Sequence, residues 1–492
     1  VIIDLPARIF KPDCLAARLC ATRQEWRNGD SMIKENFKVV VPEFPDRKVI
    51  ITEYGAVKNV FDDNTGRTNA KAINGAIEGI SNQGGGTVVI PSGIWMSAPI
   101  KLLSGVRLYL ERGAVLKFTK NIDDYPLVIT NYEGQECIRT ISPVSADGAS
   151  NIAISGYGVI DGSGDLWRPV KQFKLTDRQW KALLQKSSYV IDTKEGGIWL
   201  PTESAYLGNK NNIQGNQQEV LKQAEDFYDF YRPVMVELKN CTNVLLEDAT
   251  FMNSPAWNIH PIFCKNLTVR NVKISNPYHA QNGDGIDVES CHNVEIYNSV
   301  FETGDDAICI KSGKNAEART FVDPCENLYI HDCLVNDGHG GFVIGSEMSR
   351  GVKNILVENC TFTGTDVGVR IKSAMGRGGV VEDITVRGIN MVNIKAEAVI
   401  MTMGYVLNSL DKNEKIQQVD ESDVPYFKNI NIENVACSGC ETAIKLEPIN
   451  GRPETISDIT IKNSVFTAKN ENVVSGENIR IENVDVCHAL PG

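Results

Sequence analysis

The sequence lacks an apolar run long enough to cross a membrane, because no stretch approaches the roughly 18 uninterrupted apolar residues that a spanning helix needs. It also lacks an excess of positive charge: 50 Lys and Arg residues stand against 62 Asp and Glu residues, for a formal net charge of −12. Such a charge repels the phosphates of nucleic acids and of anionic membranes. We therefore expect neither nucleic acid nor membrane as a partner, and an anionic ligand would need local cations to hold it.

The N-terminus lacks the features of a complete secretory signal. Residues 1–5 carry no basic segment, and no full apolar segment accompanies them. The sequence alone does not decide whether a signal has been removed.

A short pattern recurs along the second half of the chain. Each copy has Asn or Asp, then an apolar-x-apolar segment, then Asn, Asp or Gly five residues after the first. Asn, Asp and Gly tolerate the left-handed backbone of a tight bend, and stacked amides can hydrogen-bond along a column. The first positions form one column: Asn243, Asn266, Asn293, Asn327, Asn354, Asp383, Asn429, Asp458 and Asn478. The second positions form another: Asp248, Asn271, Asn298, Asp332, Asn359, Gly388, Asn434, Asn463 and Asn483.

The segments between the two columns alternate β-branched and polar residues, which is typical of short strands. Short strands, Asn bends and loops of variable length predict a solenoid whose coils stack strand on strand, about 4.8 Å apart. The fold class is therefore all-β, a parallel β-helix.

Thirteen cysteines are an odd number, so they cannot all pair within the chain. Four of them lie two residues before the first column, where later coils carry Val, Phe or Ile: Cys241, Cys264, Cys291 and Cys325. We interpret these cysteines as small buried apolar residues. A ladder of disulfides is the alternative.

The remaining segments define the domain organisation. An extension is predicted over residues 1–45, followed by one β-helix domain over 46–492. A helix at Asn69–Ile77 is predicted to cap the first coil, because an open coil end exposes apolar side chains and a strand edge. Residues 166–232 do not fit the repeat and contain two predicted helices, Thr176–Lys186 and Gln217–Tyr231. An insertion of this length either walls a binding groove or is a surface elaboration.

Four central coils align on the serine that ends each one: Ser290, Ser312, Ser346 and Ser373. Strand alternation then directs two columns into the coil. They are Ile286, Ile308, Phe342 and Val369, and Val288, Ile310, Ile344 and Ile371. The columns between them are predicted to point outward: Asp287, Cys309, Val343 and Arg370, and Glu289, Lys311, Gly345 and Lys372. A bare floor for a polymer groove is predicted at Gly285, Ala307, Gly341 and Gly368.

The alignment predicts that several titratable residues are neighbours on stacked coils. Asp284 stacks on Asp306, and Asp305 shares a column with His339. Carboxylates this close cannot all ionise freely, so one should hold its proton while another stays anionic. Glycoside hydrolysis needs that combination of an acid and a base. Taken singly, each of these residues is equally well an ordinary turn or loop residue, and the shared position is what favours a site.

Four segments in this order resemble the signatures of the polygalacturonase family of glycoside hydrolases. They are Asn282-Gly-Asp284, Gly304-Asp-Asp306, Gly338-His-Gly340 and Arg370-Ile-Lys372. The resemblance extends from about Tyr54 to the end of the chain. It implies a right-handed parallel β-helix that hydrolyses α-1,4-linked galacturonic acid in pectic polysaccharide or oligogalacturonide, with inversion and without a cofactor or metal.

The resemblance also implies residue roles. Asp305 is expected to be the general acid, and Asp284 and Asp306 to hold and deprotonate the attacking water. Inversion requires an acid and a base about 6.5–9.5 Å apart, which one to two coil rises would supply. His339 is expected to tune the acid or to touch the sugar.

A second set of residues is expected to bind substrate. Arg370 and Lys372 would hold the uronate carboxylate, one with a planar fork and one with a point charge. Asn282 and Lys311 complete this predicted set. The Gly at position 283, where many members carry Thr or Pro, is a departure that removes no titrating group.

Three further expectations follow from the resemblance. Retention of His339 favours the galacturonate homopolymer over the mixed rhamnose-galacturonate backbone. The run Gly338–Met348 is similar to bacterial exo-acting members, so the 166–232 insertion is expected to block one end of the groove. The protein is expected to be secreted or periplasmic. The oligomeric state is not determined by the sequence.

Two alternatives remain at this point. A pectate lyase would hold calcium with the Asp cluster and use Arg370 as a base. A non-catalytic β-helix would bind polysaccharide without turnover. An endo-acting or a rhamnogalacturonan-specific hydrolase is the alternative within the family.

Overall fold

The computed structural model describes residues 37–211, 224–320, 323–405 and 420–488. The chain divides into two units, Val1–Lys38 and Val39–Gly492, and the second contains the described elements. The predicted extension over 1–45 lies mostly outside the described residues and stays a prediction. None of the described helices combines the length and apolar character that crossing a bilayer requires.

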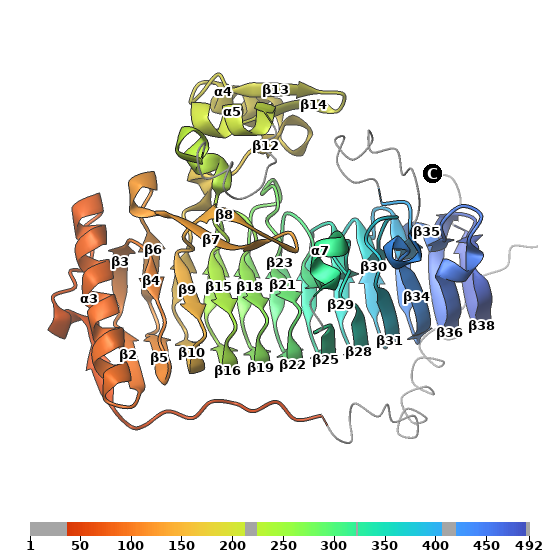
Figure 1. Ribbon diagram of the computed structural model, residues 1–492. Helices are drawn as coiled ribbons and strands as arrows, with labels where there is room; N and C mark the ends of the chain where they lie inside the picture. Colours follow the sequence, from red (N-terminus) through yellow and green to blue (C-terminus); the bar gives the residue numbers. More distant parts are fainter. Residues whose placement is uncertain (1–36, 212–223, 321–322, 406–419, 489–492) are drawn as a thin grey trace, which may run out of the picture. The chain divides into compact units, whose positions relative to one another are not determined.

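The second unit is the predicted right-handed parallel β-helix, built from three ladders of parallel strands (Figure 1). The ladder that carries the candidate site runs through β4 (Ile100–Lys101), β9 (Val144–Asp147), β15 (Val236–Lys239), β18 (Ile259–Ile262), β21 (Ile286–Glu289), β24 (Ile308–Lys311), β27 (Gly340–Ile344), β30 (Val367–Lys372) and β33 (Glu397–Thr402). Because consecutive coils add neighbouring strands to each ladder, residues a full coil apart in sequence become neighbours in space.

Two further ladders complete each coil. The longer one runs through β1 (Lys48–Ile50), β2 (Gly86–Ile90), β5 (Val106–Leu110), β10 (Ser150–Gly156), β16 (Thr242–Glu247), β19 (Lys265–Arg270), β22 (His292–Tyr297), β25 (Cys325–His331), β28 (Val352–Glu358), β31 (Val380–Arg387), β34 (Tyr426–Glu433), β36 (Ile456–Asn470) and β38 (Glu477–His488). The third runs through β3 (Gly93–Ser97), β6 (Ala114–Phe118), β11 (Val159–Asp161), β17 (Thr250–Met252), β20 (Lys273–Ser275), β23 (Val300–Glu302), β26 (Leu334–Asn336), β29 (Thr361–Thr363), β32 (Asn390–Val392) and β35 (Ala436–Glu447). Their inward side chains form one continuous apolar core.

Both Asn columns are confirmed. Every residue of the two predicted columns has a positive φ, as the bends require. Amides of the first column hydrogen-bond from coil to coil; for example, Asn266 Nδ2 donates to Asn243 Oδ1 at 2.9 Å. The column of Asn side chains extends one coil further toward the N-terminus than the sequence pattern indicated, because Asn243 Nδ2 donates to Asn151 Oδ1.

The cysteine prediction is confirmed as well. Cys241, Cys264, Cys291 and Cys325 are buried, and their thiols are free. The thiol of Cys264 donates to the carbonyl of Leu238 at 3.1 Å. Within the described part of the chain, the cysteine column is therefore a strip of core.

The predicted capping helix is present and longer than expected. It is α3 (Asp63–Asn82), with Asp62 as the N-cap that accepts a hydrogen bond from the amide of Thr65. One face of α3, which includes Ile73 and Ile77, is fully buried against the first coils. The helix therefore closes the apolar interior at this end.

The insertion folds into small elements of its own, shown above the coils in Figure 1: β12 (Val170–Lys171), η4 (Gln172–Lys174), α4 (Asp177–Leu184), β13 (Val190–Thr193), β14 (Gly196–Trp199), α5 (Glu203–Asn211) and η5 (Ala224–Tyr231). The helix predicted from Thr176 is confirmed as α4, with Thr176 as its N-cap. The second predicted helix, Gln217–Tyr231, lies partly outside the described residues. Its described part is the 3₁₀ segment η5 and not an α-helix, because Phe227 interrupts the helical geometry.

A second excursion was not predicted from the sequence. Strands β7 (Leu127–Tyr132) and β8 (Gln135–Thr140) form an antiparallel hairpin that belongs to none of the three ladders. Figure 1 shows this hairpin running across the strands of the site-bearing ladder toward α7 (Asn315–Arg319). We call it the roof hairpin, residues 127–140.

Candidate active site

The predicted register of the four central coils is confirmed by the strand pairing. Ile286, Ile308, Phe342 and Val369 are partners in successive strands, and so are Asp287, Cys309, Val343 and Arg370. Strands β21, β24 and β27 begin at or just after the turns that carry the first three polar signatures, whereas the fourth, Arg370-Ile-Lys372, lies within β30. The turns therefore stack one above another at the same edge of the ladder.

Three carboxylates meet at this edge. Oxygens of Asp284, Asp305 and Asp306 lie within 4.8 Å of one another. Asp284 is 3% exposed and Asp306 is 2% exposed, whereas Asp305 is partly open to solvent. The turns are tied directly together, because the amide of Gly285 donates to the carbonyl of Asp306 at 2.9 Å. The predicted stacking of Asp284 on Asp306 is therefore present.

The spacing is shorter than expected for an inverting pair. A separation of 4.8 Å or less between the nearest oxygens falls below the about 6.5–9.5 Å that was predicted. The physical reason is that Asp284 and the Asp305-Asp306 pair are on consecutive coils, so a single coil rise separates them.

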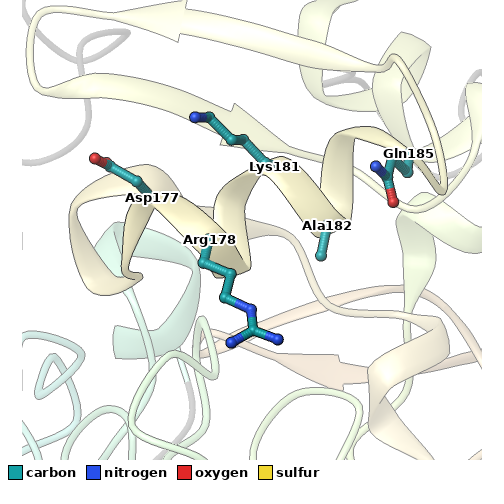
Figure 2. Close-up of a pocket in the computed structure, with 5 residues that line it drawn as sticks. All are labelled: Asp177, Arg178, Lys181, Ala182 and Gln185. Atoms are coloured by element: carbon teal, nitrogen blue, oxygen red, sulfur yellow. The ribbon is translucent and has the colours of Figure 1, made fainter.

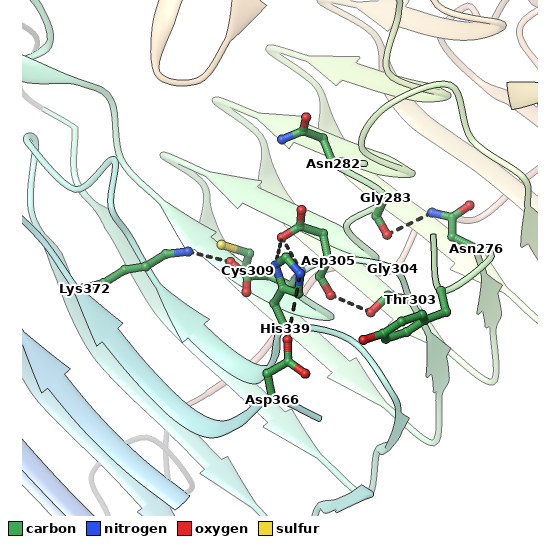
Figure 3. Close-up of polar contacts among 12 residues, drawn as sticks. Asn276, Asn282, Gly283, Thr303, Gly304, Asp305, Cys309, His339, Asp366 and Lys372 are labelled. Carbon is green, nitrogen blue, oxygen red and sulfur yellow. Dashed lines mark hydrogen bonds and ion pairs between the residues drawn. The ribbon is translucent and has the colours of Figure 1, made fainter. Parts of the chain in front are cut away.

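His339 contacts Asp305, as the column predicts. Its Nδ1 lies 3.0 Å from Oδ1 of Asp305, and its backbone amide donates to the carbonyl of the same residue at 3.0 Å. On the other side of the ring, Nε2 lies 3.9 Å from Oδ2 of Asp366. Figure 3 shows His339 between these two carboxylates.

The two predicted cations occupy different environments. Lys372 is buried, and its Nζ donates to Oδ2 of Asp306 at 2.7 Å. The Arg370 side chain is partly exposed, although its Nε is a buried atom without a hydrogen-bond partner. Both cations lie over the ring of Tyr405, at 5.8 Å for Arg370 and 5.1 Å for Lys372. Arg370 therefore has donor capacity left for an anion, while Lys372 already neutralises a carboxylate.

The carboxylate pKa values are pushed apart, as crowding predicts. Burial, reinforced by the charges of Asp287, Asp305 and Asp306, raises the pKa of Asp284 well above its usual range. Burial also disfavours the anion of Asp305, but the charge and hydrogen bond of His339 in its protonated form outweigh burial and lower the pKa of Asp305. The raised pKa of Asp284 and the lowered pKa of Asp305 differ from what the resemblance implies, which is that Asp305 is the acid.

The other two residues of the predicted binding set are engaged by groups of the protein. Lys311 points out of the coil, as predicted, but it is 5% exposed and pairs with Glu347 at 2.9 Å and with Asp287 at 3.7 Å. Its contact with substrate stays a prediction. The surface above this part of the sheet is filled by protein. Asn282 accepts a hydrogen bond at Oδ1 from Arg232 Nη2 at 2.6 Å, which fixes its side chain toward the base of the insertion.

The structure differs from the expectation that the small residues beneath the charges form a groove floor, because Gly341 and Gly368 face side chains of the core. A Cβ on Gly341 would lie 2.5 Å from the ring of Phe362, and one on Gly368 would lie 2.5 Å from the sulfur of Met391. These glycines make room for side chains of the buried core.

The roof hairpin explains why the outward side chains are buried. Tyr132 packs on Trp257 with ring centroids 4.4 Å apart, and the hydroxyl of Thr130 donates to Glu237. At the tip, the amide of Lys314 donates to the carbonyl of Gly134 at 3.2 Å. The hairpin therefore covers the ladder on one side of the carboxylates and ends close to α7.

Lys174 is a site residue that the sequence analysis missed. It ends η4 in the insertion, and its Nζ donates to the carbonyl of Gly304 at 2.7 Å and to that of Tyr278 at 3.2 Å. The same atom lies 3.3 Å from His339 Nε2. No periodicity marks this position, because η4 lies in an irregular segment.

A separate hollow lies beside α4 and is lined by Asp177, Arg178, Lys181, Ala182 and Gln185 (Figure 2). It shares no residue with the carboxylate cluster. As for metals, the three Asp carboxylates are the group of described residues whose spacing suits a cation. The ammonium of Lys372 already supplies positive charge there, and we assign no metal to them.

Comparison with known proteins adds independent evidence. Residues 206–487 match the model of glycosyl hydrolases family 28. The chain is 30% identical over 413 residues to an exo-poly-alpha-D-galacturonosidase from Dickeya chrysanthemi, covering 81% of this chain but only 64% of that protein. It is 27% identical over 406 residues to a probable polygalacturonase from Vitis vinifera, covering 80% of this chain and 71% of that protein. The crystal structure of a hyperthermoactive exopolygalacturonase from Thermotoga maritima is similar at 30% identity and a TM-score of 0.74, covering 92% of this chain and 95% of the other.

Proposed function

The chain belongs to glycosyl hydrolases family 28, and on this basis we propose that it hydrolyses α-1,4-linked galacturonic acid in pectin or polygalacturonate, releasing product from a chain end. One observation carries the proposal: four signature segments on consecutive coils bring three carboxylates, a histidine and two cations to one edge of a ladder. Acid and base groups side by side, next to a partly exposed Arg, suit an anionic sugar polymer.

The proposed roles begin with the proton donor. Asp305, the most open of the three carboxylates, gives its proton to the leaving oxygen, while Asp284 and Asp306 hold and deprotonate water. Asp305 must gain a proton before each turnover, although a protonated His339 and the neighbouring cations lower its pKa. A bound uronate supplies a nearby negative charge and excludes water, and both effects raise the pKa of a carboxyl group.

Inversion is the general stereochemical outcome in this family, and we propose it here. The short carboxylate spacing alone would also suit a nucleophilic carboxylate and retention. Proton NMR of the first product, recorded before mutarotation, tests the proposal: a β-anomer supports inversion, whereas an initial α-anomer refutes it.

Binding of the uronate is proposed for Arg370, whose side chain is partly exposed beside the carboxylates. Lys372 acts mainly by neutralising Asp306 and by adding positive potential at the same place. An acidic protein can then bind an acidic polymer, because the relevant cations are local to the site.

Exo action is supported by the roof hairpin, which covers the ladder on one side of the carboxylates. If the roof hairpin blocks one side of the site, a polygalacturonate chain cannot pass through and can place only its end there. Chromatography of early products from polygalacturonate tests this: galacturonate monomer alone supports exo action, and a ladder of oligomers would favour the endo alternative.

The calcium-dependent lyase is the second candidate, because the Asp cluster has a cation-compatible spacing. It predicts an unsaturated product that absorbs in the ultraviolet and is abolished by a chelator. The hydrolase predicts reducing ends without that absorbance and full activity in the chelator.

We also propose that the protein acts in the periplasm or outside the cell, where polymeric pectin is found. Fractionation of the native cells, with activity on polygalacturonate as the readout, tests this. Activity confined to the cytoplasmic fraction would refute it.

A further inference from the structure

Lys174 connects the insertion to the centre of the site. Its ammonium has three protons, and three acceptors surround it: the carbonyl of Gly304 at 2.7 Å, the carbonyl of Tyr278 at 3.2 Å and Nε2 of His339 at 3.3 Å. The Nζ also lies 5.0 Å from the centre of the Tyr278 ring. With its donors used inside the protein, Lys174 has little capacity left for substrate.

The contact with His339 determines where the imidazole carries its proton. A lysine ammonium can only donate, so Nε2 must be the acceptor, without a proton of its own. The proton of a neutral ring is then on Nδ1, which lies 3.0 Å from Oδ1 of Asp305. The other nitrogen therefore fixes the hydrogen bond to the proposed acid.

The charged groups around His339 have opposite effects on which ring nitrogen carries the proton. Asp366 faces Nε2 at 3.9 Å and would favour a proton there, but Asp366 is itself paired with Lys395 at 3.2 Å. Lys174 is closer to Nε2 than Asp366 is, and its charge also opposes a second proton on the ring. Asp305, on the Nδ1 side, accepts a hydrogen bond only when Nδ1 carries a proton.

We propose that Lys174 is a positioning residue that holds His339 as the neutral tautomer with its proton on Nδ1, directed at Asp305. An imidazolium beside Asp305 would keep that carboxylate anionic, whereas a neutral ring leaves it able to take up the proton that it must donate. Lys174 also ties down the carbonyl of Gly304, the residue that precedes Asp305. The insertion thus serves as part of the catalytic apparatus.

This inference deepens the proposed hydrolysis and rests on it for the kinetic readout only. The first test is NMR of the full chain labelled with ¹⁵N-histidine, with the His339→Asn variant used to assign the signals. The wild type should show protonated Nδ1 and unprotonated Nε2 for His339. Lys174→Met should convert the ring to the Nε2-protonated or the doubly protonated form, because Asp366 is then unopposed.

The second test is kinetic and includes matched variants. Lys174→Met should lower kcat by about tenfold or more and change KM by less than about twofold, because the lost group acts through the acid and not on the substrate. If the NMR shows a doubly protonated ring in Lys174→Met, the basic limb of the pH profile should move to lower pH, because an imidazolium lowers the pKa of Asp305. If it shows the neutral Nε2-protonated ring, the limb should move to higher pH, because Lys174 is among the cations that lower that pKa. Lys174→Arg keeps the charge and donors and should restore the Nδ1 tautomer. Lys181→Met, an exposed change in α4 of the same insertion, is the control and should match the wild type.

Two results would overturn the proposal. One is a wild-type His339 that carries its proton on Nε2, or on both nitrogens, at a pH of full activity. The other is a Lys174→Met enzyme, folded by circular dichroism, that matches Lys181→Met in both spectrum and pH profile. A protein with the predicted tautomer but no action on polygalacturonate would refute the proposed function and leave the role of Lys174 toward His339 standing.

Discussion

The Nζ of Lys372 lies 2.7 Å from Oδ2 of Asp306, and both side chains are almost fully buried. The two residues are 66 positions apart in sequence and meet because their coils are stacked. A buried pair of this kind is costly to break, since the remaining charge has no water to solvate it.

Lys372→Met should therefore lower the free energy of unfolding by about 3–5 kcal/mol, measured by urea denaturation. The double variant Lys372→Met with Asp306→Asn removes both charges and should regain much of that stability, but no activity. A double variant as unstable as the single one would contradict the pairing argument.

Asp305→Asn should abolish turnover of polygalacturonate while leaving the fold intact, because the amide cannot donate a proton to the leaving oxygen. The loss expected for a general acid is about 10²–10⁴-fold in kcat, measured as released reducing ends. Asp177→Asn, on the surface of α4, is the matched control. A non-catalytic β-helix would show no difference between the two variants.

Arg370→Gln should mainly raise KM for polygalacturonate, since it removes the cation proposed to hold the uronate and leaves the carboxylates in place. Loss of a charged hydrogen bond to a substrate costs about 1.5–3 kcal/mol, or roughly 10- to 150-fold in kcat/KM. Arg370→Lys should recover part of this, because a point charge replaces the planar fork. If Arg370→Gln lowers only the stability, Arg370 is structural.

Shortening the roof hairpin should change the pattern of products. Residues 129–138 can be replaced by an Asn-Gly turn, which closes a two-residue hairpin between Val128 and Arg139. With the ladder uncovered on that side, oligomers should appear among the early products. Monomer as the sole product of a folded variant would mean that another element blocks the groove.

Asn266→Ala tests the amide ladder. Asn266 has a φ of 57° and exchanges hydrogen bonds with Asn243 and Asn293. Alanine loses both bonds and resists the left-handed backbone, so we expect a loss of about 2–4 kcal/mol in unfolding free energy. Asn266→Gly keeps the backbone and should lose less.

Much of the fold and the chemical centre could be predicted from the sequence, because the coil repeat is local. Asn bends, alternating strands and the serine that ends each central coil are enough to place Asp284, Asp305, Asp306 and His339 together. The same periodicity identified the cysteine column as core.

The sequence could not show which outward positions are exposed. Strand alternation gives the direction of Lys311 but not its exposure, and the side chain is buried among neighbouring charged groups such as Glu347. The direction of the carboxylate pKa shifts likewise depends on burial and on the neighbours of each oxygen.

The sequence by itself determined the parallel β-helix, its stacked bends and the meeting of the signature segments. The reason is that each coil repeats the same local pattern of Asn or Asp bends and alternating strand residues. Only the tertiary structure decided that Lys174 reaches His339, 165 positions away, and that the hairpin covers one side of the site. These contacts arise from irregular excursions, whose course depends on the surfaces they pack against and not on any repeat in the chain.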